Sequence, residues 1–216
     1  MTWRLGRFGR DESGAAMVEA TIAMTLFLTL TLGFVDFGYA FYQWNAAAKA
    51  VQVGARMASV SPPVSPAVTT AGPTSSPGDP IPVWNSSNPS GSYRFICIGG
   101  DATSCTNYDD TAFSRIFRGD TAPSNDDVCP ALTAGQRPGM CHFFPRLRRQ
   151  DVQVTYVSTG LGYQTRPDGA VPTIIVEIRP GLAFQFFFLS GLLGFNNINI
   201  PPMRSTVTGE DLGNGA

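Results

Sequence analysis

Hydrophobic and polar positions divide the chain into a long apolar run near the N-terminus, a helical continuation and several short alternating segments. Residues 15–35 contain one charged side chain, Glu19. A helix rises 1.5 Å per residue, so about 20 apolar residues cross the roughly 30 Å hydrocarbon core of a bilayer. The pattern therefore predicts a transmembrane helix over residues 15–35.

The helical pattern continues to residue 59, shortly before the first proline of the chain, Pro62. Spacings of three and four residues place apolar side chains on one side, namely Phe37, Phe41, Trp44, Ala48, Val51, Ala55 and Ala58. The other side carries Asn45, Lys49, Gln52, Arg56 and Ser59. We expect one helix over 15–59, with its second half against a soluble domain. Gly33, Gly38 and Gly54 are points where it can bend.

Residues 60–92 separate the helix from the later strands and contain eight prolines but one charge, Asp79. Proline lacks the N–H group that helices and central strands need. We therefore expect a Pro/Ser-rich surface loop over 60–92, with a flexible linker as the alternative.

Four later segments have the composition of β-strands: residues 93–98, 151–159, 173–179 and 203–208. They are short, rich in β-branched or aromatic side chains and bounded by turn residues. In the second segment Val152, Val154 and Tyr156 share one face. Three or four such strands on the long helix predict an α+β fold, with a β-rich domain over 93–216.

Charges around the apolar run predict its orientation. Three arginines precede it (Arg4, Arg7 and Arg10) and Asp36 follows it, so the positive-inside rule leaves the N-terminus in the cytoplasm and exports the remainder. A cleaved signal peptide is the alternative, with the alanines at 46–48 as its site, but the apolar run is longer than the usual 7–15 residues. A net charge of −1 argues against a basic nucleic-acid-binding surface.

Glu19 is the most informative residue of the apolar run, because a charge inside a membrane span costs at least about 2.5–3.5 kcal/mol. Such a residue either has a functional partner or lies close enough to the interface to reach water or take up a proton. Its context distinguishes these alternatives. A short basic leader ends at Gly14, and Glu19 is the fifth residue after that glycine.

This arrangement resembles the type IV prepilins. The resemblance implies that prepilin peptidase cuts between Gly14 and Ala15 and leaves a new α-amino group on Ala15. That cation and the Glu19 carboxylate can neutralise each other between neighbouring subunits and set the register of packed helices.

A second motif narrows the resemblance. Asn45 and the run Gly54-Ala55-Arg56 are similar to the motif of TadE-like proteins, the minor pilins or pseudopilins of tight-adherence (Flp-type) pilus systems. The resemblance covers residues 1–60, and Ala20 departs from the Phe or Tyr usual in Flp-type prepilins. It implies a pilin-like helix on a small antiparallel sheet and a role in pilus assembly or surface adhesion.

The same resemblance implies the partners and the location. The partners would be prepilin peptidase, other pilin subunits, the assembly platform and the lipid of the bacterial inner membrane. The chain would cross that membrane once with a periplasmic C-terminal domain, or reach the outside within a pilus. The alternative function is a signal-anchored periplasmic binding or scaffold protein that is never cleaved.

The four cysteines are expected to form disulfides, because an exported domain folds in an oxidising compartment. Four cysteines allow three pairings, and close spacing favours Cys97–Cys105 and Cys129–Cys141. No cysteine pair has CxxC spacing and His142 is the one histidine, so a metal site is not expected. No other cofactor and no catalytic constellation is indicated, which predicts a substrate of an enzyme rather than an enzyme.

Three further segments carry candidate surfaces. The acidic pairs Asp109-Asp110 and Asp126-Asp127 are expected to be solvated loops, with Ca²⁺ binding as the alternative. The basic run 146–149 is expected to be an exposed turn, facing these aspartates or contacting lipid headgroups or an acidic partner. The apolar stretch 182–195 is too short to span a membrane, so it is expected to be core, an interfacial segment or a subunit contact.

Overall fold

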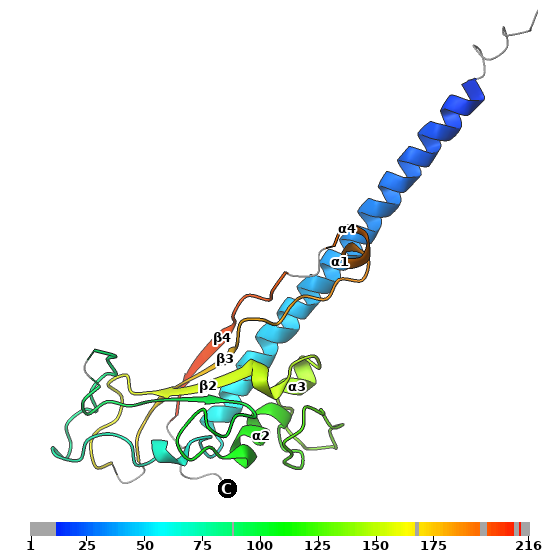
Figure 1. The fold of residues 1–216 in the computed structure, drawn as a ribbon. Helices are drawn as coiled ribbons and strands as arrows, with labels where there is room; N and C mark the ends of the chain where they lie inside the picture. Colours follow the sequence, from blue (N-terminus) through cyan, green and yellow to red (C-terminus); the bar gives the residue numbers. More distant parts are fainter. Residues whose placement is uncertain (1–11, 88, 167–168, 195–197, 210–211, 213–216) are drawn as a thin grey trace, which may run out of the picture. The chain divides into compact units, whose positions relative to one another are not determined.

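The computed structural model describes residues 12–87, 89–166, 169–194, 198–209 and 212 (Figure 1). The chain forms two compact units. The first consists of Met1–Tyr42 and Phe184–Ile198, and the second of Gln43–Ala183 and Asn199–Ala216. The arginine-bearing leader, residues 1–11, lies outside the described residues.

One helix, α1 (Glu12–Ser59), contributes to both units. The predicted helix over 15–59 is therefore confirmed, with an earlier start. It runs as one element through all three glycines that were expected to allow bending. Gly54 instead permits close packing, because a Cβ atom at that position would lie 2.5 Å from the sulfur of Met140.

The second unit contains a four-stranded antiparallel sheet in the order β1-β2-β3-β4. Its strands are β1 (Arg94–Ile98), β2 (Val152–Val157), β3 (Thr173–Ile178) and β4 (Arg204–Thr208). Val152, Val154 and Tyr156 share one face of β2, as predicted, and the structure shows that all three are fully buried. Val154 is opposite Cys97 on β1 and Val176 on β3, so the register stacks buried side chains across three strands.

The C-terminal part of α1 packs on this sheet, so the predicted α+β fold is confirmed. Its buried face consists mainly of small residues, namely Ala47, Ala50, Val51, Gly54, Ala55, Met57 and Ala58. The predicted apolar face is wrong at its start, because Phe37 and Phe41 are 65% and 68% exposed. Trp44 is 39% exposed. The buried stripe begins instead at Gln43, whose amide oxygen accepts a hydrogen bond from Arg146.

The described part of the second unit also contains four short helices. They are η2 (Pro66–Val68), α2 (Asp110–Arg118), α3 (Met140–Phe143) and η3 (Arg149–Asp151). The carboxylate of Asp109 caps α2 by accepting from the N–H groups of Thr111 and Ala112. The amphipathic pattern of α2 buries Phe113, Ile116 and Phe117.

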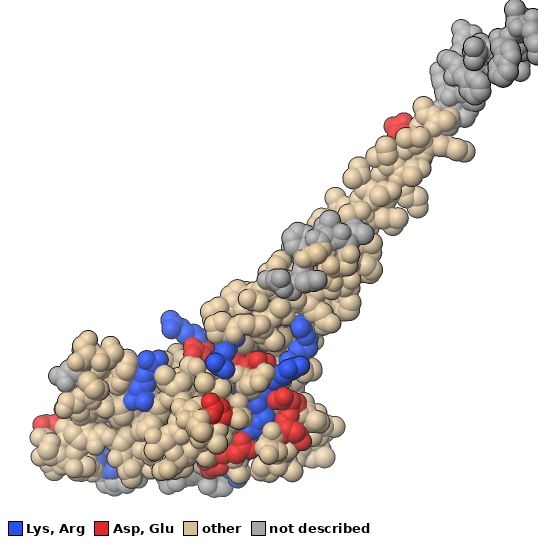
Figure 2. Space-filling model, in the orientation of Figure 1, with Lys and Arg blue, Asp and Glu red and all other residues tan. Residues whose placement is uncertain are grey.

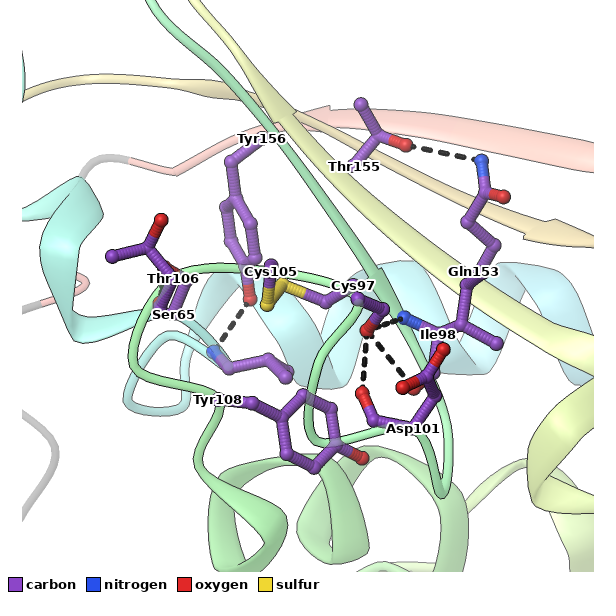
Figure 3. The surroundings of a disulfide bond; sticks show 12 residues. Ser65, Cys97, Ile98, Asp101, Cys105, Thr106, Tyr108, Gln153, Thr155 and Tyr156 are labelled. Atoms are coloured by element: carbon purple, nitrogen blue, oxygen red, sulfur yellow. Dashed lines mark hydrogen bonds between the residues drawn. A yellow bond between two sulfur atoms is a disulfide. The ribbon is translucent and has the colours of Figure 1, made fainter.

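Disulfides join Cys97 to Cys105 and Cys129 to Cys141, the pairs that close spacing favours. Figure 3 shows the ring of Tyr156 beside the first of these bonds. Its hydroxyl oxygen accepts from the N–H of Val64 at 3.0 Å, and burial raises the pKa of Tyr156 above its ordinary value. The disulfide loop is thus held against the start of the proline-rich segment.

That proline-rich segment is built into the second unit rather than loosely attached to it. Val64, Val68 and Ile81 are buried, and Ser65 donates to the carbonyl of Thr106 at 2.6 Å. Backbone hydrogen bonds also join Trp84 to Ser158, Ile81 to Gly162 and Gly78 to Gln164. Over its described residues, the surface-loop expectation fits the segment better than the flexible alternative.

The acidic pairs and the basic run form one network. Arg149 is 2% exposed and contacts the carboxylate of Asp110, the carbonyl of Ser124 and, through its backbone N–H, the carboxylate of Asp127. Arg118 pairs with Asp126 at 2.9 Å. Asp126 and Asp127 are exposed, as expected, but they also bind these arginines and are not simply solvated. The expectation of an exposed basic turn holds for Arg146 and Arg148 and is wrong for Arg149. Arginine faces the aspartates, as expected, but the arginines that do so are buried.

Candidate functional site

The first unit presents an apolar helix surface. Within the described residues, α1 is the one helix long and apolar enough to cross a membrane, and no residue of its most apolar stretch is buried. Figure 2 shows this helical surface almost free of charge, whereas the second unit displays both signs. The helix fits a single-pass membrane anchor.

Every threonine hydroxyl between residues 15 and 35 is satisfied within the helix itself. Thr21, Thr25, Thr29 and Thr31 each donate to the carbonyl four residues earlier, at 2.7–3.0 Å. A polar group in lipid needs such a partner, because water is absent. These hydroxyls are therefore compatible with a lipid-facing surface.

Glu19 differs from the threonines. Its side chain is exposed and makes no hydrogen bond or ion pair with the described part of the chain. Ala15 and Glu19 are four residues apart, one turn along the same helix face. An amino group on Ala15 and the Glu19 carboxylate would therefore lie near one another on that face and be open to a neighbour.

The Gly14–Ala15 bond lies in the first turn of α1. The first four N–H groups of a helix have no intrahelical partner, so this turn unwinds at the smallest cost. Nothing lies within 4 Å of a Cβ atom placed on Gly14. The bond is accessible on the described surface.

Asp36 is another acidic residue of the first unit and, unlike Glu19, it is buried and hydrogen-bonded. It is 0% exposed, and its two carboxylate oxygens accept from three consecutive backbone N–H groups. The donors are Phe187 at 2.9 Å, Phe188 at 2.8 Å and Leu189 at 2.6 Å. They lie at the start of α4 (Leu189–Leu193), so Asp36 holds the segment 184–194 on α1.

The remaining family-motif residues lie in the second unit. Gly54 and Ala55 are buried, whereas Asn45 and Arg56 are exposed. Arg56 lies in the last turn of α1, where a cation interacts favourably with the helix dipole. Gly54 and Ala55 therefore contribute to packing, whereas Asn45 and Arg56 lie on the surface.

One cluster could in principle hold a metal: the ligand atoms of Cys129, Cys141 and His142 lie within 4.8 Å of one another. The disulfide occupies both sulfur atoms. His142 accepts from the N–H of Gly139 through Nδ1 and lies 2.9 Å from the carbonyl of Pro130 through Nε2. These sulfur and nitrogen atoms are therefore already engaged in the disulfide and in hydrogen bonds.

The structure places Gly14, Ala15 and Glu19 together at the start of α1 and places the motif residues Asn45 to Arg56 in the other unit. The sequence pattern used Asp36 only to predict the orientation of the span in the membrane. The signal that could have found it is a charge at the end of an apolar run combined with a charge-free apolar segment elsewhere.

Comparison with known proteins agrees with the location of these features. No curated protein and no solved structure matches the chain. The model of one protein family, described as TadE-like protein, matches residues 14–56. The TadE-like resemblance is thereby confirmed over the segment that begins at the candidate cleavage site and ends at Arg56, and it indicates a pilus-associated protein.

Proposed function

We propose that this chain is a TadE-like prepilin of a tight-adherence pilus, processed by prepilin peptidase after Gly14 and then used as a minor pilin or pseudopilin. One observation carries the proposal. In a helix surface whose threonine hydroxyls are all satisfied, Glu19 is an exposed carboxylate without a partner among the residues that the structure describes.

The chemistry of cleavage supplies that partner. Cutting the Gly14–Ala15 bond creates a cationic amine one turn from Glu19 on the same helix face. Each group is costly in lipid alone, and a neighbouring processed subunit offers the opposite charge to both. Assembly would therefore be favoured at one register of adjacent helices. The TadE-like match over residues 14–56 supports this assignment.

The arrangement in the cell follows from the same residues. The arginines before the span predict a cytoplasmic N-terminus at the inner membrane and a periplasmic second unit. Two disulfides suit an oxidising compartment. The partners would be the peptidase, other pilin subunits and the assembly platform.

Processing is tested by mass spectrometry of the full chain from cells with and without the peptidase. We expect the mature chain to start at Ala15, and Gly14→Val to block this. Gly33→Val is the matched control, since nothing lies within 4 Å of a Cβ atom at either glycine. An intact N-terminus in cells that contain the peptidase would refute processing and favour the uncleaved anchored binding protein.

The role of Glu19 is tested separately by copurification with pilus fibres. Glu19→Gln keeps the side-chain size and removes the charge. We expect normal insertion and cleavage but at least about tenfold less incorporation, which corresponds to about 1.4 kcal/mol. Met17→Gln is the control, because Met17 is exposed and the same amide is added two residues away. Equal incorporation of both variants would contradict the pairing of Glu19.

A further inference from the structure

We propose that residues 184–194 are a second membrane-contacting segment, which lies in the interfacial layer of the bilayer that α1 crosses and is fastened to α1 by Asp36. The proposal rests on the membrane-spanning role of α1. It does not rest on cleavage or pilus assembly.

The depth follows from the helix rise. Ala15 and Asp36 are separated by 21 residues of one continuous helix, or roughly 31 Å at 1.5 Å per residue. This distance matches the roughly 30 Å hydrocarbon core. When Ala15 lies at one boundary, Asp36 therefore lies at the other, and the backbone that it binds lies at the same level.

The Asp36 carboxylate is suited to that level. Three N–H groups replace its water shell and no part of it is exposed. Hydrogen bonds to an ionised carboxylate are among the stronger ones in proteins. The carboxylate therefore attaches the segment to α1 without itself facing lipid.

The segment has an inward and an outward side. Phe186 and Leu189 are buried, whereas Phe187 and Phe188 are 57% and 44% exposed. The ring of Phe187 also lies 4.7 Å from that of Tyr39, between ring centroids. Residues 184–198 contain no charged side chain. Phe and Leu side chains form the apolar side of segments that lie in the interfacial layer of a bilayer.

The occupant that this surface fits is lipid. The exposed rings continue the apolar surface of α1 beside Asp36, where Phe34 and Phe37 are 71% and 65% exposed. The segment is too short to span a bilayer but long enough to lie in one leaflet. A second copy of the chain is the competing occupant, and the experiment distinguishes it.

The test uses the full chain in vesicles of phosphatidylcholine and phosphatidylglycerol, without any pilus component. Both native cysteine pairs are disulfide-bonded, so one added cysteine takes up a nitroxide label selectively. Phe188→Cys reports on the segment, Leu26→Cys on the middle of the span and Val128→Cys on an exposed site of the second unit. Paramagnetic relaxation by oxygen and by a water-soluble nickel complex measures the depth of each label.

We expect the label at 188 to be more accessible to oxygen than to nickel, with a depth between those at 26 and 128. Accessibility equal to that at 128 would place the segment in water and overturn the proposal. Protection from both reagents, with line broadening that grows with protein density, would assign the surface to a second copy and also overturn it.

The fastening is tested by adding Asp36→Ala to the labelled protein. We expect a more mobile label at 188 and a shift of its depth toward water, whereas Asp79→Ala, at an exposed acid of the second unit, should change neither. Intact disulfides by gel mobility would show that the second unit has folded. An unchanged depth and mobility in Asp36→Ala would refute the role of Asp36.

Discussion

The two disulfides permit a quantitative prediction about the second unit. Their sequence separations are 8 and 12 residues. In the chain-entropy model, closing such loops removes about 2.5 and about 2.8 kcal/mol of unfolded-state freedom at 25 °C. We therefore expect Cys97→Ala/Cys105→Ala to destabilise the unit by about 2.5 kcal/mol, and removal of both bonds to cost about 5 kcal/mol.

This loss is large compared with the 5–15 kcal/mol stability of ordinary domains. With a urea m-value of about 2 kcal/mol per molar, the first variant should lower the unfolding midpoint by about 1 M. Pulse proteolysis of the full chain in detergent micelles measures that midpoint. Because the Cys105 loop is held against Val64 and Ser65, the first new cleavage should fall near those residues.

Cys129→Ala/Cys141→Ala is the matched comparison. Its midpoint should fall by a similar amount, but the proline-rich segment should stay protected. The hydrogen bonds described for that segment run to Thr106, Asp109 and residues 156–164 rather than to the Cys129–Cys141 loop. An unchanged midpoint in either variant would refute the entropic reasoning. Early cleavage near Val64 in both variants alike would refute the local coupling.

Three further predictions concern the second unit. Arg149→Met removes a buried guanidinium that contacts Asp110 and the Ser124 carbonyl, so we expect the free energy of unfolding in urea to fall by about 1.5–3 kcal/mol. Arg148→Ala, at the exposed neighbour, should lower it by at most about 0.5 kcal/mol. Equal effects would contradict the network. Tyr156→Phe leaves the N–H of Val64 without its acceptor, and hydrogen exchange of that amide should accelerate while β2 stays protected. Hydrogen bonds from Ser124 and Val128, with Arg118 nearby, hold the pKa of Asp126 below its ordinary value. The stability that ionised Asp126 contributes is therefore complete above about pH 4 and is lost as the pH falls through its lowered pKa in the folded state. Asp126→Asn should flatten that acid limb in unfolding experiments, and an unchanged limb would exclude Asp126 as its source.

The strands and the long helix could be predicted because their patterns reflect burial directly. Alternation in β2 matches a face that is fully buried, and the apolar run of α1 has the length of a bilayer. The buried stripe after residue 42 could not be read from apolar periodicity, which favoured Phe37 and Phe41. Periodicity does not distinguish a helix face that contacts protein from one that contacts lipid, since both are apolar.

The features that sequence reasoning missed depend on distant partners. Asp36 binds backbone N–H groups about 150 positions away, and backbone groups have no side-chain signature. The acidic pairs read as solvated loops because Arg149 lies 39 residues from Asp110 and 22 from Asp127. In contrast, Gly14, Ala15 and Glu19 form a local pattern, so the prediction that they are a processing and assembly site needs no structure.

The internally bonded threonines have a consequence for movement along a helix bundle. A hydroxyl that bonded a neighbouring helix would have to break that bond at each step of sliding or rotation. Thr21, Thr25, Thr29 and Thr31 instead keep their bonds as the helix moves. Among the polar side chains between residues 15 and 35, Glu19 would then be the one that a neighbouring helix must bind and release, so in the proposed pilus this carboxylate would influence how quickly a subunit enters or leaves its position.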